Sequence, residues 1–225
     1  MSTSASPAPP TVDAHVAADV VPSWKLLVTL GLAGAASGLL IVLLYMWTLP
    51  GIEAHKAGIL RTAITQVLKN PARSDTLYLV AGALTAKAPP ADPSMQVERV
   101  YRGYDASGKP IGYAIEAKGP GFSETIRLLF GVDVQRHELL GMTVLESKET
   151  PGIADDVDRP VFTSQFAGAK TPVEGVKASA QDKPVGTIVM ITGATISSRA
   201  VLKAINTTLA RWQPLLERYE RGGTH

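Results

Sequence analysis

A short run of small and hydroxylated residues near the C-terminus is the part of the chain best suited to chemistry. It reads Thr192-Gly193-Ala194-Thr195 and is followed by the start of a helical pattern. Gly193 and Ala194 have little bulk, so a large group or a modifying enzyme can approach the Thr195 hydroxyl. The first turn of a helix has unpaired N–H groups and the positive end of the dipole. A phosphate attached to Thr195 would be well placed there, and Ser197 in the same turn is a further candidate contact.

Other kinds of chemistry find little support in the composition. The absence of cysteine excludes disulfides, thiolate-held iron–sulfur clusters and Cys-based zinc sites. The four His residues show no ligand spacing, and no residue stands out as a general acid or base. The formal net charge is +2 and the 22 Lys and Arg are scattered, which argues against nucleic-acid binding. Any redox chemistry must therefore come from an organic cofactor or a partner.

The motif also fits an ordinary strand-to-helix connection in which Thr and Ser side chains cap the helix. Apolar residues recur at helical spacing from Ser197 to about Tyr219, which predicts a helix with one buried face. The short apolar run Thr187–Ile191 predicts a strand before the motif, and the polar residues 167–184 predict a loop. The buried stripe of the helix is predicted to be Val201, Ile205, Leu209, Trp212 and Leu216.

Upstream of these elements, alternation of apolar and polar residues predicts two β-hairpins and hence an antiparallel sheet. Strands and helices do not alternate regularly, so the fold class is α+β, with flanking helices on the sheet. The predicted strands are residues 97–101, 111–115, 125–132 and 139–145, with turns at 105–110 and 133–137.

The N-terminal part of the chain predicts a membrane anchor. Leu26 to Leu49 carries no charge and is long enough to span a bilayer. It is predicted to stay uncleaved, because it lacks a preceding basic region and Tyr45-Met46-Trp47 is a poor cleavage site. Four regions follow: a disordered tail (1–23), a transmembrane anchor (24–49), a juxtamembrane helix and loop (50–95) and one folded domain (96–221).

Within 50–95, residues 57–69 predict a short amphipathic helix after Pro50-Gly51, and residues 71–95 predict a loop or insertion. In the anchor, Gly34 and Gly38 form a Gly-x-x-x-Gly pair. Such a pair leaves a smooth face on which a partner helix can pack.

Thr192-Gly193-Ala194-Thr195, with the Ile-Ser-Ser that follows it, resembles the flavinylation motif of the FMN-binding domain family. Two further segments, Glu149-Thr150-Pro151-Gly152 and Gly119-Pro120-Gly121-Phe122, resemble that family's Glu-Thr-Pro-Gly signature and its glycine and aromatic segment. The family includes the G subunit of the Rnf electron-transport complex and the C subunit of the Na⁺-pumping NADH:quinone oxidoreductase. The single anchor and the length fit the Rnf protein. Val189 and Ser147 depart from the family pattern, which often has an acidic residue and a His there.

The resemblance implies that FMN is joined through its phosphate to Thr195 by a dedicated flavin transferase. Glu149, Thr150 and Phe122 are then candidates for contacts near the flavin ring. The implied function is electron transfer within a membrane-bound, ion-translocating ferredoxin:NAD⁺ oxidoreductase complex, rather than catalysis by this chain alone. The alternatives are an FMN carrier like that of the Na⁺-pumping oxidoreductase and a non-redox, membrane-anchored sensory or assembly module.

The implied partners are other membrane subunits, contacted through Gly34 and Gly38. The implied location is the bacterial inner membrane, with the FMN domain on the periplasmic side. The positive-inside rule favours the opposite orientation, because Lys25 precedes the anchor whereas Lys56, Arg61 and Lys69 follow it. Long domains cross membranes largely regardless of charge, so the family orientation is the one expected.

Overall fold

The computed structural model describes residues 22–90, 97–122, 124–147, 155–181, 184 and 186–222. The chain divides into two compact units, residues 1–53 and 54–225. Glu149 and Thr150 of the predicted site lie outside the described residues, as does most of the predicted N-terminal tail.

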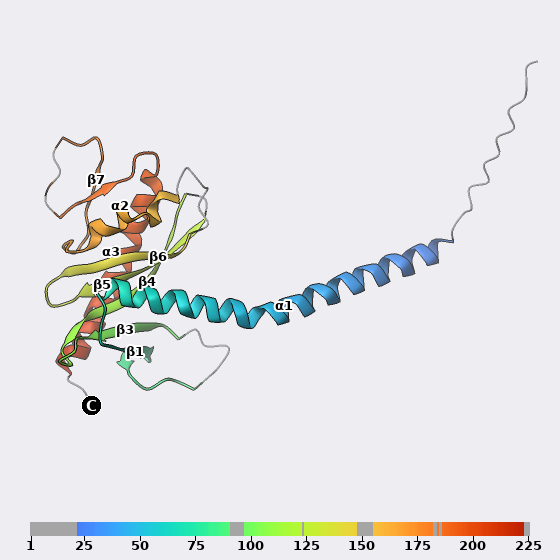
Figure 1. Ribbon diagram of the computed structural model, residues 1–225, viewed down its shortest axis with the longest axis horizontal. Coiled ribbons are helices and arrows are strands. Elements are labelled where there is room, and N and C mark those ends of the chain that lie inside the picture. The colour runs from blue at the N-terminus through green and yellow to red at the C-terminus, as the bar shows by residue number, and fades with distance from the viewer. Residues whose placement is uncertain are drawn as a thin grey trace, which may run out of the picture. The chain divides into compact units, whose positions relative to one another are not determined.

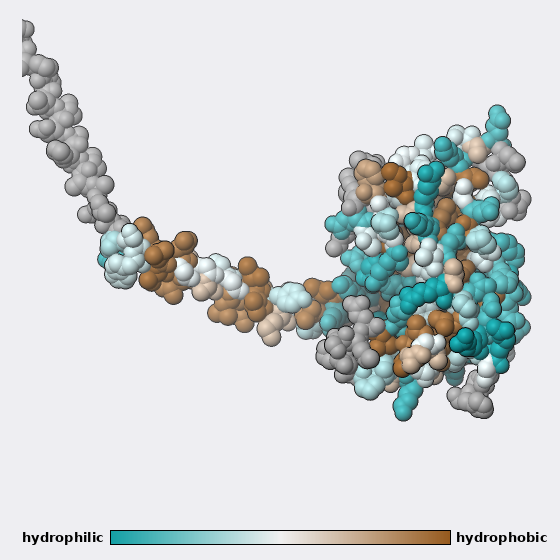
Figure 2. Space-filling view, turned by 180° about the vertical axis from the view of Figure 1, so that it is seen from behind, coloured by the Kyte–Doolittle hydropathy of each residue, from teal (hydrophilic) through white to brown (hydrophobic). Residues whose placement is uncertain are grey.

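The helix α1 (Ser23–Val67) is the one helix in the described part of the chain that is long and apolar enough to cross a membrane. Nearly all of its large apolar side chains up to Ile52 are exposed, and Figure 2 shows the apolar residues in brown along this part of the helix. Two helices separated at Pro50-Gly51 were expected here, but α1 continues through Pro50. A proline inside a helix removes one backbone hydrogen bond and favours a kink, and here it does not end the helix.

The second unit is built on a six-stranded antiparallel sheet in the order β2-β1-β3-β4-β5-β6 (Figure 1). The two predicted hairpins are confirmed as β3 with β4 and β5 with β6. The strands are β1 (Arg73–Val80), β2 (Ala83–Thr85), β3 (Arg99–Tyr104), β4 (Pro110–Pro120), β5 (Thr125–Asp133) and β6 (Glu138–Glu146).

The prediction of a loop over residues 71–95 is wrong, because β1 and β2 lie within it. They form a hairpin around Ala81 and Gly82, both of which have positive φ. The alternation in β1 is weak, since only Leu77 is fully buried and polar residues lie on both faces of the strand. The tight turn at Ala81-Gly82 was the missed signal.

The two faces of the sheet are covered by different helices. The long helix α3 (Thr195–Arg221) packs on one face, and its predicted stripe from Val201 to Leu216 is buried. The end of α1 packs on the other face, where Ala63, Ile64 and Val67 join Leu129 in a second core. Residues of β5 therefore alternate between the two cores, as a strand buried on both faces requires.

The remaining segments lie beside β6 and α3. Two 3₁₀ turns, η1 (Asp155–Asp158) and η2 (Ser164–Phe166), flank the short helix α2 (Pro160–Thr163). The strand predicted at 187–191 is confirmed as β8 (Ile188–Met190). It pairs in parallel with β7 (Gly175–Lys177), which lies inside the segment predicted as a loop. The α+β class is confirmed.

Candidate functional site

The motif forms a tight turn between β8 and α3. The Ala194 N–H donates to the Ile191 carbonyl at 3.2 Å, which closes a four-residue turn over Thr192 and Gly193. Gly193 has a φ of +88°, a backbone conformation that residues other than glycine rarely adopt. The glycine is therefore required by the backbone of the turn, and Thr192, at the second position, has an exposed side chain.

The helix after this turn begins without a side-chain cap. Ala194 is its N-cap residue and has no hydroxyl, and no acidic residue lies in the first turn. Within the described residues, the backbone N–H groups of Thr195, Ile196 and Ser197 have no hydrogen-bond acceptor. Three N–H groups and the positive end of the dipole of a 27-residue helix are thus available to an anion beside the half-buried Thr195.

Thr195 also has a hydroxyl that no other described residue holds by a hydrogen bond. Thr192 does not cap the helix in this structure, although the motif also fits an ordinary capped strand-to-helix connection. Ser197 is fully buried, and its Oγ has no hydrogen-bond partner among the described residues. A buried Ser197 is badly placed to contact a large ligand directly, although its backbone N–H remains open at the helix start.

Ser198, which the motif did not single out, is the hydroxyl that holds the turn. Its Oγ donates to the Ala194 carbonyl at 2.9 Å and accepts from the Ile191 N–H at 3.1 Å. Its side chain is fully buried. The sequence signal was the Ser four residues after the N-cap, a spacing at which a hydroxyl can bond the carbonyl one turn back.

The strand before the turn is held by a side-chain amide from another segment. Gln165 of η2 accepts from the Val189 N–H at 2.8 Å and donates to the Val189 carbonyl at 3.3 Å. These bonds act through the backbone, so the identity of the residue at 189 does not affect them. Val189, where the family often has an acid, is thereby fixed on one edge of β8 while β7 pairs with the other.

Strand β4, near its end, approaches the first half of α3 closely at Gly119. A Cβ added to Gly119 would lie 3.0 Å from the Ala204 Cβ and 3.1 Å from the Ala200 carbonyl oxygen. Small residues on both elements are therefore needed for this packing. Phe122, just after β4, is 57% exposed, which makes it one of the few large apolar side chains on the described surface of the domain.

An ion cluster joins the three neighbouring strands β4, β5 and β6. Arg127 of β5 donates to Glu116 of β4 at 2.9 and 3.1 Å and to Glu146 of β6 at 2.9 Å. Burial alone would lower the pKa of Arg127, but these two carboxylates raise it above its usual value. The cluster therefore ties β4, β5 and β6 together close to the end of β6.

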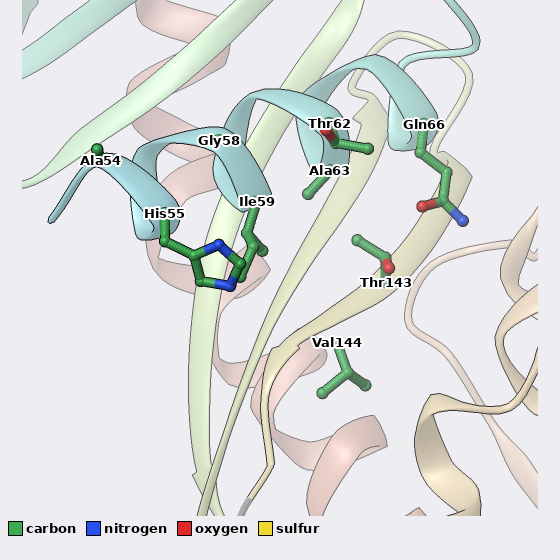
Figure 3. Close-up of a pocket in the computed structure, with 9 residues that line it drawn as sticks. All are labelled: Ala54, His55, Gly58, Ile59, Thr62, Ala63, Gln66, Thr143 and Val144. Atoms are coloured by element: carbon green, nitrogen blue, oxygen red, sulfur yellow. The ribbon is translucent and has the colours of Figure 1, made fainter. Parts of the chain in front are cut away.

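A cleft elsewhere on the domain contains none of the predicted site residues. It has a volume of about 480 Å³ and lies between the end of α1 and the edge strand β6 (Figure 3). His55, Ile59 and Thr62 project from one side, with Thr143 and Val144 on the other. Among the described residues there is also no cluster of His, Asp or Glu that could hold a metal ion. The polar features that suit a phosphate therefore lie at the start of α3.

Comparison with known proteins identifies the class of the folded unit. Residues 121–210 match the FMN-binding domain family, which defines the class of the folded unit. The crystal structure of Shewanella oneidensis NqrC has the same fold, with a TM-score of 0.62 at 18% identity, covering 74% of this chain and 100% of that one.

Relatives that align with most of the chain identify its family more closely. The G subunit of the ion-translocating oxidoreductase complex of Methanosarcina acetivorans is 29% identical over 185 residues, covering 82% of this chain and 92% of that protein. The corresponding protein of Aliivibrio fischeri (strain MJ11) is 31% identical over 179 residues, covering 78% and 83%. The chain belongs to the family of G subunits of ion-translocating oxidoreductase complexes, as the motifs predicted.

Proposed function

We propose that this chain is the membrane-anchored FMN carrier of an Rnf-type ion-translocating oxidoreductase complex, with the flavin joined covalently to Thr195. The observation that carries the attachment site is the start of α3. A hydroxyl lies there beside three backbone N–H groups, all without a hydrogen-bond partner among the described residues, within the region that matches the FMN-binding family. Bound FMN supplies reversible electron uptake and release, and the protein holds it between neighbouring subunits.

The residues present fit a phosphoryl group on Thr195. A phosphodiester carries one negative charge, which the uncapped helix start accommodates without an opposing acid in its first turn. Attachment requires an activated donor such as FAD, in which FMN is linked through a pyrophosphate. The Thr195 oxygen forms a bond to the FMN phosphorus, the pyrophosphate bond breaks and AMP leaves. The hydroxyl proton passes to a base of the flavin transferase.

Substitution of the two threonines tests the attachment site. Full-length protein is co-expressed with a flavin transferase, and the denatured band is examined for flavin fluorescence and by mass spectrometry. Thr195→Ala is expected to lose covalent flavin completely, because the attacking oxygen is gone. Thr192→Ala, the matched control in the same turn, is expected to keep it. Fluorescence on denatured Thr195→Ala, or its loss from Thr192→Ala alone, would show that the site is misassigned.

Phe122 is a candidate contact of the flavin ring, with Glu149 and Thr150, because a large exposed aromatic side chain can stack on a flat heterocycle.

Gly34 and Gly38 are candidates for contact with a membrane subunit, since a Cβ at either position would meet open space. Replacing both glycines by Leu should reduce co-purification with the membrane subunits while leaving flavin attachment unchanged. Unchanged co-purification would remove this face from the interface.

We also infer that the folded domain lies on the periplasmic side of the inner membrane. The support is membership of the G-subunit family together with a candidate span near the N-terminus. Protease added to intact spheroplasts should digest the domain while cytoplasmic markers survive. Digestion only after lysis would refute this orientation and leave the attachment site unaffected.

A further inference from the structure

We propose that Ser198 is a positioning residue for flavin attachment, because its hydroxyl locks the turn that presents Thr195. This inference rests on the proposed attachment of FMN to Thr195. Ser198 itself is fully buried, so it acts through the backbone and touches neither flavin nor transferase. Its role differs from that of Ser197, the equally buried neighbour whose Oγ bonds nothing in the described structure.

Ser198 joins the two ends of the turn through a closed set of hydrogen bonds. The Ala194 N–H donates to the Ile191 carbonyl at 3.2 Å, and the Ile191 N–H donates to the Ser198 Oγ at 3.1 Å. The same Oγ donates to the Ala194 carbonyl at 2.9 Å. The hydroxyl thus donates one hydrogen bond and accepts one. These two bonds hold Ile191 and Ala194 against the first turn of α3.

The Ala194 carbonyl is the group that this arrangement fixes most firmly. It accepts from the Ser198 Oγ and also from the Ser198 N–H at 2.9 Å, the first hydrogen bond of the helix. The peptide that carries this carbonyl also carries the N–H of Thr195. Its orientation therefore determines where the Thr195 side chain and the open N–H groups point.

Thr195 depends on this backbone support because no other described residue orients it. Its hydroxyl has no hydrogen-bond partner among the described residues, and Thr192 and Gly193 before it are exposed. Removing the Ser198 Oγ leaves the Ile191 N–H without its acceptor and the Ala194 carbonyl with one bond in place of two. The turn then samples conformations that the transferase must reorder before the Thr195 oxygen can reach phosphorus, which slows transfer.

The experiment measures the initial rate of covalent flavin incorporation into full-length protein. Wild type, Ser198→Ala, Ser198→Thr and Ser197→Ala are expressed without transferase and purified in detergent. Each is then incubated with purified flavin transferase and FAD at a temperature where circular dichroism shows all four folded. Ser197→Ala is the matched control, because it removes the same oxygen from the adjacent, equally buried serine.

We expect Ser198→Ala to be about tenfold slower than wild type, the effect of one lost buried hydrogen-bonding group. Ser198→Thr, which keeps the hydroxyl, should recover most of the rate, and Ser197→Ala should match wild type. A rate for Ser198→Ala equal to wild type would overturn the proposal. So would an equal loss in Ser197→Ala, or a Ser198→Thr no faster than Ser198→Ala.

Failure of this inference is distinguishable from failure of the attachment site. A wild-type chain that takes up no covalent flavin, or a Thr195→Ala variant that does, contradicts the assignment of Thr195. Wild-type incorporation that depends on Thr195 but is unchanged in Ser198→Ala contradicts only the role of Ser198.

Discussion

The two ends of α3 are built in opposite ways. At its start, the N-cap has no side-chain hydrogen bond and three backbone N–H groups have no acceptor among the described residues. At its far end, Arg218 and Arg221 lie in the last turn, where positive charge offsets the dipole. Glu220 there accepts from the Tyr113 hydroxyl at 3.2 Å and from Gln135 at 2.7 Å.

Cation–π contacts with tyrosine rings also hold the far end of α3. The Arg102 guanidinium lies 5.3 Å from the ring centre of Tyr104, 5.7 Å from that of Tyr113 and 5.5 Å from that of Tyr219. Contacts of this kind attach the end of α3 to β3 and β4. The difference is that the far end of α3 is held by side-chain contacts, whereas the N–H groups at its start have no acceptor among the described residues. We therefore expect substitutions at the far end to change stability without changing flavin attachment.

The largest loss of stability is expected from Leu216→Ala. Leu216 is fully buried under the sheet, and truncating such a residue costs about 2–5 kcal/mol. Chemical denaturation of the detergent-solubilised protein measures the loss, and flavin per folded chain should stay at the wild-type level. Leu215→Ala is the control, because its half-buried side chain should cost clearly less. Loss of flavin from folded Leu216→Ala would contradict the separation of the two ends.

At the start of α3, Gly119→Ala is expected to lower both stability and flavin attachment. The added methyl would crowd Ala200 and Ala204, at a cost of about 1–3 kcal/mol in the free energy of unfolding. It would also shift the first turns of the helix and so move Thr195. Gly141→Ala is the matched control, since its Cβ would meet its nearest atoms at an ordinary 3.6 Å. Denaturation and flavin incorporation are measured on both variants, and equal behaviour would show that the approach of Gly119 to α3 does not position Thr195.

Arg102→Met should cost about 1–2 kcal/mol in the free energy of unfolding, from the loss of its contacts with three tyrosines. Flavin attachment should be unchanged, because Arg102 contacts the far end of α3, away from Thr195. Arg99→Met on the same strand is the control: Arg99 is exposed and has no ion pair among the described residues, so its loss should be nearly neutral. If chemical denaturation finds the two variants equally stable, the aromatic contacts of Arg102 contribute nothing measurable.

Much of this fold could be predicted from periodicity. The stripe of α3 and the hairpins of β3 to β6 have strong alternation, and the structure confirms them. The strands β1 and β7 were missed because each has few buried residues and depends on pairing with a neighbour that is remote in sequence or weakly patterned. Tertiary pairing of this kind overrides weak local preference.

The sequence predicts a phosphate site at Thr195, but it did not predict the hydrogen bonds that support the backbone there. Small residues around a threonine, next to a helical pattern, indicated a phosphate site at Thr195 from sequence alone. The sequence did not show which of two adjacent serines holds the turn. That depends on the direction in which each Oγ points, and only Ser198 points back to Ile191 and Ala194. Gln165 was likewise missed, because 24 residues separate it from Val189.

The smallest expected effect is that of Tyr113→Phe, which removes one hydrogen bond to Glu220 and should cost about 1 kcal/mol at neutral pH. Burial raises the pKa of Tyr113, Arg102 lowers it and Glu220 raises it, with a net increase over the usual value. The folded protein therefore keeps Tyr113 protonated at a pH where the unfolded chain releases that proton. The contribution of Tyr113 is fully present below the unfolded pKa of about 10 and is lost as pH rises above it.

The direction of the Tyr113 pKa shift is tested by the free energies of unfolding of wild type and Tyr113→Phe, measured from pH 8 to pH 11. The wild-type value should fall more steeply than the variant value above about pH 10, so the gap between them narrows. Tyr101, whose pKa is also raised by burial, is unchanged in both proteins and cancels in the difference. A gap that stays constant or widens with rising pH would contradict a raised pKa for Tyr113. Flavin attachment should be the same in both proteins, because Tyr113 contacts the end of the helix that lies away from Thr195.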